Sequence, residues 1–152
     1  MSVESGAQCR KAQNMVKQLS IFVQNEAGSL ARVTKVFKEN QINIRAIASF
    51  DSPEFGILRT IVDQPDVAKK VLEENHFIVR LTEVLAVELE DKPGGLDSVL
   101  GVLAQENLNV NYIYSFVLRG VKEPLMIINL DDLAGAAELL QKNGVKVVDS
   151  IQ

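Results

Sequence analysis

Apolar and polar residues follow two distinct periodic patterns along this chain. An apolar side chain at every second position predicts a half-buried strand, and apolar side chains three or four positions apart predict an amphipathic helix. From Lys17 onward these patterns predict six elements in the order strand, helix, strand, strand, helix, strand. Their ranges are Lys17–Gln24, Ser29–Asn40, Ile44–Phe50, Ile57–Val62, Asp66–Asn75 and Phe77–Leu81. In the first helix Leu30, Val33 and Phe37 form the apolar stripe, and in the second Val67, Val71 and Leu72 do so.

The same order then returns, with a constant offset of 66 residues over the first part of the pattern. The segment Gln24–Leu30 matches Glu90–Leu96, and Gln41–Ile44 matches Asn107–Val110. Residue type, turn chemistry and spacing agree over a whole unit, so the chain is a duplicated domain. The second set of elements is predicted at Val84–Glu90, Leu96–Glu106, Val110–Phe116, Leu125–Leu130, Leu133–Lys142 and Val145–Val148.

Two βαβ crossovers joined by a hairpin predict an α+β fold made of two ferredoxin-like βαββαβ domains, each an antiparallel sheet with both helices on one face. Val110, Tyr112, Tyr114 and Phe116 are expected on one side of their strand and Ile113 on the other, so both sheet faces are expected to be buried. The predicted domains are a flexible tail at 1–14, a first domain at 15–82 and a second at 83–152. The expected linker, Thr82-Glu83, lies between the last strand of the first domain and the first strand of the second.

Composition and charge narrow the class of protein. Hydrophobic residues make up 47% of the chain and aromatic residues 5%. Domains of about 65 residues bury only about 60% of their unfolded surface, so a homodimer or higher oligomer is expected. A net charge of −4 argues against a nucleic-acid partner or an anionic membrane. The polar start and the single Cys9 lead us to expect a cytoplasmic protein.

Each copy has a loop that suits a zwitterionic ligand. A strand ends at Asn25 or Asp91, a turn contains Gly28 or Gly94, and a helix begins. Glycine allows close approach of the backbone, and the first N–H groups of a helix attract a carboxylate. The Asn25 amide or Asp91 carboxylate could accept from an ammonium group. Helix starts with Gly, Asn or Asp are common, and simple helix capping by these residues is their more common use and stays an alternative.

The run Asp91-Lys92-Pro93-Gly94-Gly95-Leu96, followed by an apolar helix and Leu108-Asn109-Val110, resembles the ACT domain, a regulatory module of amino-acid metabolism. Asn25–Leu30 with Ile42-Asn43-Ile44 is a looser second match, and the pair over Lys17–Ser150 resembles the stand-alone tandem ACT proteins. In that family the ligand lies between two ACT units, held by the first loop of one and the second strand of its neighbour. The resemblance therefore implies a free amino acid as ligand, no cofactor, and binding residues Asn25, Ala27, Gly28, Ser29, Leu30, Asn43, Ile44, Asp91, Pro93, Gly94, Gly95, Leu96 and Asn109.

The resemblance implies a non-catalytic sensor that regulates amino-acid metabolism. No nucleophile with a nearby base and no phosphate-binding glycine motif is present, so no catalytic residues are expected. A regulatory or interaction subunit of a separate metabolic enzyme, with no ligand of its own, is an alternative. An acylphosphatase-like hydrolase is the last alternative, because that chemistry needs an arginine in the first loop and this loop has Glu26 and no arginine. His76 is expected at the surface without a metal, and Arg59 in an exposed ion pair at a sheet edge or on a ligand carboxylate.

Overall fold

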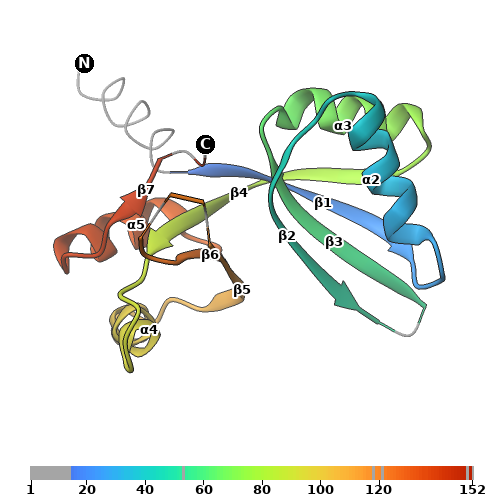
Figure 1. Cartoon of the computed structure of the whole chain (residues 1–152). Helices are drawn as coiled ribbons and strands as arrows, with labels where there is room; N and C mark the ends of the chain where they lie inside the picture. Colours follow the sequence, from blue (N-terminus) through green and yellow to red (C-terminus); the bar gives the residue numbers. More distant parts are fainter. Residues whose placement is uncertain (1–14, 53, 118, 121, 150, 152) are drawn as a thin grey trace, which may run out of the picture. The chain divides into compact units, whose positions relative to one another are not determined.

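The computed structural model describes residues 15–152 apart from 53, 118, 121, 150 and 152 (Figure 1). The predicted tail at 1–14, with Cys9, lies outside the described residues. The elements are β1 Val16–Gln24, α2 Ser29–Glu39, β2 Ile44–Asp51, β3 Phe55–Val62, α3 Pro65–Glu74, β4 Ile78–Glu88, α4 Gly95–Gln105, β5 Val110–Phe116, β6 Leu125–Leu130, α5 Leu133–Lys142 and β7 Val147–Val148.

The chain divides into two compact units, and the first is Lys17–Thr82. Its strands lie in the order β2-β3-β1-β4, and β3 is antiparallel to both β1 and β2. Figure 1 shows α2 and α3 on the same face of this sheet. Between helices and sheet lies an aliphatic core with one phenylalanine, which includes Leu19, Ile21, Val33, Phe37, Leu58 and Leu72.

The second unit spans Glu83–Ile151 and takes in Met15 and Val16. Its strand order is β7-β4-β6-β5, and β4 is antiparallel to β6 and β7, as β5 is to β6. Helices α4 and α5 contact each other. Its core includes Leu85, Val87, Val99, Leu103, Ile128 and Leu140. Both units thus confirm the predicted ferredoxin-like βαββαβ order. Within the described residues, no helix is both long and apolar enough to cross a membrane.

The two strands expected to meet at Thr82-Glu83 are one continuous strand, β4, from Ile78 to Glu88. The prediction of separate strands was wrong because neither residue breaks a strand: both Thr82 and Glu83 keep an extended backbone, and no proline or glycine lies nearby.

The apolar stripes of α2 and α3 differ in part from the prediction. Leu30 is 43% exposed and Val67 is 45% exposed. In α2 the inward position one turn before Val33 is taken by Ser29, which turns Leu30 by about 100° away from the core. In α3 the buried residues are Ala68 and Leu72, which turns Val67 outward in the same way.

A β-bulge corrects the prediction for the faces of β5. The register shifts between Val110 and Tyr112, so Val110 packs with Ile113 against the helix-covered core and does not share a face with Tyr112. Tyr112 and Tyr114 stack on the other face, with ring centroids 6.5 Å apart. Tyr114 and Ile127, which pair across β5 and β6, are both buried, so this second sheet face is buried as expected.

The helices α2, α3, α4 and α5 of the described residues all end in the same way. The residue after each C-cap has a left-handed backbone, at Gln41, His76, Asn107 and Gly144. The next amide donates back to a carbonyl five residues earlier, as from Phe77 to Leu72 and from Val145 to Leu140. These bonds hold Phe77 and Val145 at the helix ends, which is why β4 and β7 begin later than predicted.

Candidate functional site

The first loop connects β1 to α2 through a tight turn. The Glu26 amide donates to the Gln24 carbonyl at 2.9 Å, and the Ser29 amide donates to the Glu26 carbonyl at 3.3 Å. Gly28 is the N-cap, with φ 88° in the left-handed region. Residues with a Cβ rarely adopt this conformation, so the glycine is needed for the turn.

The corresponding loop of the second unit repeats this geometry. The Lys92 amide donates to the Glu90 carbonyl at 2.8 Å, and the Gly95 amide donates to the Lys92 carbonyl at 3.1 Å. Gly94 is the N-cap of α4, with φ 87°. The two copies therefore share a backbone conformation as well as a sequence pattern.

The N-caps of α2 and α4 are the glycines Gly28 and Gly94, so the alternative of simple helix capping holds for glycine and not for the side chains of Asn25 and Asp91. Neither α2 nor α4 has a side-chain hydrogen bond at its N-cap. Each loop is tied to the hairpin of its own unit: the Asn25 side-chain amide donates to the Ser52 carbonyl at 3.3 Å, and the Asp91 backbone amide donates to the Glu123 carboxylate at 3.0 Å. A helix start capped only by glycine leaves its first N–H groups without a side-chain acceptor.

The predicted loop residues differ in accessibility. In the first copy Asn25, Ala27, Gly28 and Leu30 are exposed, but Ser29 is only 3% exposed, and its hydroxyl accepts from the Arg32 guanidinium at 3.2 Å. In the second copy the exposed residues are Asp91, Pro93 and Gly94, while Gly95 and Leu96 are half-buried.

The charges around the second loop differ from those around the first. Lys92 forms an ion pair with Glu90, whose hydrogen bond and negative charge raise the pKa of Lys92. Lys92 therefore stays protonated at neutral pH beside Asp91. In the first copy the loop acid Glu26 pairs with Arg32 of the following helix, at 3.2 Å. The two loops thus present different surroundings to a ligand.

Asn43 and Ile44 lie at the far end of the first unit from its glycine loop. Ile44 pairs with Val62 at one end of the sheet, whereas Gln24 pairs with Phe55 at the other. Strand β2 has eight residues, so these ends are separated by roughly 25 Å. One small ligand cannot touch both groups within a single unit.

Asn109 occupies the same far end in the second unit. Its side chain donates to Asn111 at 3.4 Å, and Asn111 in turn donates to Asn129 at 3.0 Å and to Asp131 at 3.2 Å. In the first copy the polar contact is between the Asn43 backbone amide and the Asp63 carboxylate, at 3.0 Å. Sequence reasoning missed Asn111, whose place in the repeat is taken by Arg45 in the first copy.

The structure contradicts the expected position of Arg59 and confirms the exposure of His76. Arg59 lies on the interior strand β3, so the expected position at a sheet edge is wrong; its guanidinium stacks 4.6 Å from the centre of the Phe50 ring. His76 is exposed in the turn after α3, as expected. Across the described residues, no three His, Cys, Asp or Glu side chains gather closely enough to hold a metal ion.

Comparisons with known proteins agree with this fold. A model of the ACT domain pair matches residues 14–151. A Bacteroides thetaiotaomicron protein of known crystal structure is 36% identical with a TM-score of 0.84, over 90% of this chain and 94% of that chain. The regulatory subunit of aspartate kinase from Thermus thermophilus, in ligand-free form, has a TM-score of 0.62 at 16% identity, over 86% and 94%.

The E. coli aspartokinase III in complex with lysine and aspartate has a TM-score of 0.50 at 22% identity, over 84% of this chain and 30% of that chain. At these low identities the two kinase likenesses concern the fold. None of the curated proteins matches the chain significantly.

Proposed function

The chain belongs to the family of ACT domain pairs, and from this premise we propose that it is a non-catalytic sensor that binds a free amino acid between ACT units. The ligand carboxylate lies on the backbone N–H groups at the start of α2 or α4. Its ammonium group lies toward Asn25 or Asp91. The remaining contacts come from the second strand of a neighbouring unit, through Asn43 and Ile44 or through Asn109.

The observation that carries this proposal is the glycine N-cap shared by both copies. Gly28 and Gly94 hold the same left-handed conformation, at φ 88° and 87°, and no side chain caps either helix. The positive end of each helix dipole is therefore not met by a protein side chain at the N-cap, and it favours an anion.

The distance between the two groups of binding residues supports an oligomer. The glycine loop and the start of β2 stand at opposite ends of a strand roughly 25 Å long, so the site is completed only when another ACT unit brings its own second strand to the loop. A homodimer or higher homo-oligomer supplies such pairs by symmetry, because the same patches meet twice.

A regulatory role follows from the family and from what its relatives are. The Thermus thermophilus protein is a regulatory subunit of aspartate kinase, and the E. coli kinase was solved with lysine and aspartate. By analogy, we assign to this chain a small amino acid as ligand and a cytoplasmic enzyme of amino-acid metabolism as the target of regulation.

A second candidate is an interaction subunit that binds an enzyme and no small molecule. Exposed apolar side chains favour it, since Phe55 is 47% exposed and Ile78 is 69% exposed. An acylphosphatase-like hydrolase stays the last alternative: the loop offers Glu26 where that chemistry requires an arginine, and Arg32 belongs to the following helix.

A thermal-shift screen against the twenty amino acids separates the first two candidates. A ligand at about 100 times its Kd should stabilise the folded state by roughly 2.7 kcal/mol. One or a few related amino acids should raise the melting temperature in proportion to the logarithm of their concentration. A flat screen at millimolar ligand would favour the interaction subunit over the sensor.

A further inference from the structure

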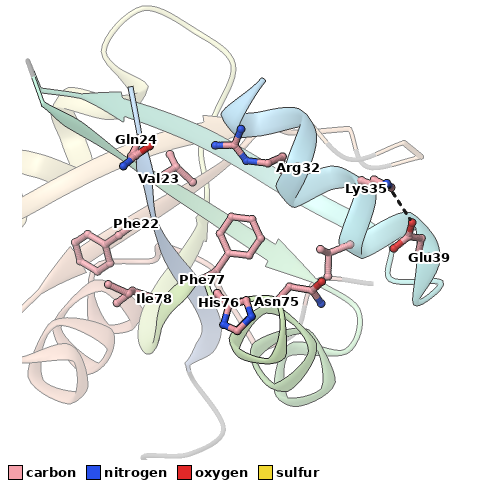
Figure 2. A pocket seen from close by; sticks show the side chains of 11 residues that line it. Phe22, Val23, Gln24, Arg32, Lys35, Glu39, Asn75, His76, Phe77 and Ile78 are labelled. Carbon is pink, nitrogen blue, oxygen red and sulfur yellow. Dashed lines mark ion pairs between the residues drawn. The ribbon is translucent and has the colours of Figure 1, made fainter. Parts of the chain in front are cut away.

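A groove of about 560 Å³ lies on the Lys17–Thr82 unit, apart from the loop amides of the proposed amino-acid site (Figure 2). Helix α2 forms one wall, the end of β1 another, and the turn from α3 into β4 a third. Figure 2 shows Arg32, Lys35 and Glu39 along α2, with His76, Phe77 and Ile78 on the turn. The volume is within the range of about 300–1,000 Å³ that small-molecule sites occupy.

The lining combines apolar surface with positive charge. Phe22, Phe77 and Ile78 supply two aromatic rings and an aliphatic side chain, while the cationic side chains come from Arg32 and Lys35. Glu39 is the single carboxylate among the lining residues. Such a surface suits a molecule with one negative group and an apolar body.

Lys35 and Arg32 form only exposed ion pairs within the protein. Lys35 lies 3.8 Å from Glu39 in an exposed pair, a kind of contact that contributes little. The Nη2 atom of Arg32 contacts Glu26 and Ser29, each at 3.2 Å. A guanidinium carries five N–H donors on three nitrogens, so it can also bind a carboxylate of a ligand.

The second unit has an equivalent groove with a different lining. Its volume is about 370 Å³, and it includes Lys92 and Lys146 but also three carboxylates. Ser98 stands where the first copy has Arg32, Gly144 where it has His76, and Val145 where it has Phe77. The three carboxylates belong to Glu88, Glu90 and Glu123. The guanidinium, imidazole and aromatic groups therefore line the groove of the first copy alone, whereas both grooves contain lysines.

His76 occupies the left-handed position that follows a helix C-cap, as Gln41 and Asn107 also do. His76 has φ 69° in the left-handed region, where the second copy has Gly144 at φ 79°. A residue with a Cβ is disfavoured there relative to glycine. The first copy thus keeps an imidazole at the groove in a conformation that glycine would adopt without strain.

We propose that this groove binds a small monocarboxylate with an apolar body, next to the first glycine loop, whose Glu26 and Ser29 contact Arg32, but not on the loop amides proposed to hold the amino acid. The carboxylate meets the Arg32 guanidinium, and His76 lines the same groove beyond the Phe77 ring. The apolar body lies on Phe77 and Ile78. Because Glu39 and Asn75 also line the groove, an α-ammonium group could be accepted there as well, so the shared chemistry of the ligand is its carboxylate and apolar side chain.

Calorimetry with 3-phenylpropionate tests this proposal on the full chain. We expect saturable binding, weakened at least about tenfold for 3-phenylpropan-1-ol, which lacks the charge, and for propionate, which lacks the ring. Phenylalanine in a parallel titration distinguishes the two sources: tighter binding than 3-phenylpropionate indicates an amino acid, and weaker binding indicates a carboxylic acid without an ammonium group.

Variants locate the site. Arg32→Ser and His76→Gly introduce the residues of the second copy and should each weaken 3-phenylpropionate binding, the first by at least about tenfold. Lys38→Ser removes a cation of α2 that does not line the groove and should leave this binding unchanged. A folded wild-type protein that does not bind 3-phenylpropionate, or undiminished binding by both groove variants, would overturn the proposal, while amino-acid binding by the wild-type protein tests the site between ACT units separately.

Discussion

Replacing His76 by glycine should stabilise the protein, although the change removes a whole side chain. A residue with a Cβ in the left-handed conformation costs about 1–2 kcal/mol, and glycine loses about 0.5–1 kcal/mol through its greater freedom in the unfolded chain. The exposed imidazole contributes little packing. We therefore expect a net gain of about 0.5–1 kcal/mol, or roughly 1–4 °C in melting temperature for a chain of this size.

The assay is urea unfolding followed by circular dichroism. His76→Gly should raise the midpoint with an unchanged slope, and the reciprocal Gly144→His should lower it by a similar amount. Both amides donate to the third residue before them, Glu73 and Gln141, so the two sites are closely matched. A lower midpoint for His76→Gly would show that the imidazole makes a stabilising interaction larger than its backbone strain, and would refute this reasoning.

Three further predictions follow from single contacts and from the exposed surface. Gly95→Ala places a methyl group against the Glu90 carbonyl and should cost about 1–3 kcal/mol of stability in thermal unfolding. The control Gly101→Ala adds a methyl group that meets no neighbour, and it should gain up to about 1 kcal/mol. Equal effects of the two changes on stability would show that the Glu90 carbonyl does not crowd position 95. Asp132→Ala removes the side chain that accepts from the Gly135 amide at 3.0 Å, and should cost about 0.5–2 kcal/mol in urea unfolding, a loss that Asp132→Asn should largely avoid. Sedimentation at micromolar concentration should show a dimer or larger species, and a single 16.7 kDa species would contradict the oligomer.

The repeat predicted most of the fold because strong periodic patterns report which residues face a core. The bounds of β5, β6 and α5 agree with the sequence to the residue. The errors lie where backbone geometry departs from a simple period. A bulge moved Val110 to the other face, and the hydrogen bonds that end the helices delayed β4 and β7. The only sequence signal for a continuous strand through Thr82-Glu83 is the absence of proline and glycine, which does not by itself distinguish a strand that continues from two that meet.

The candidate site was predictable only as far as the backbone of its loops. Left-handed glycines at Gly28 and Gly94 follow from the repeat. The absence of side-chain capping at α2 and α4 does not, since Asn25 and Asp91 are common capping residues whose partners here are set by the hairpins. The groove beside His76 was missed because it joins a helix, a strand end and a turn far apart in sequence. The sequence did contain one sign of this groove: the equivalent positions of the two copies differ, with Arg32 in the first and Ser98 in the second.

The central claim, that an amino acid is held by the glycine loops, is tested most directly by calorimetry on loop variants. The ligand would be the amino acid found in the thermal-shift screen. Gly28→Val and Gly94→Val force a β-branched residue into the left-handed conformation and obstruct the backbone. Gly101→Val is the matched control, an exposed helical glycine with no neighbour within 4 Å of an added Cβ. We expect at least one loop variant to lose binding while its circular dichroism stays native and the control binds as wild type. Undiminished affinity in both folded loop variants would contradict the claim.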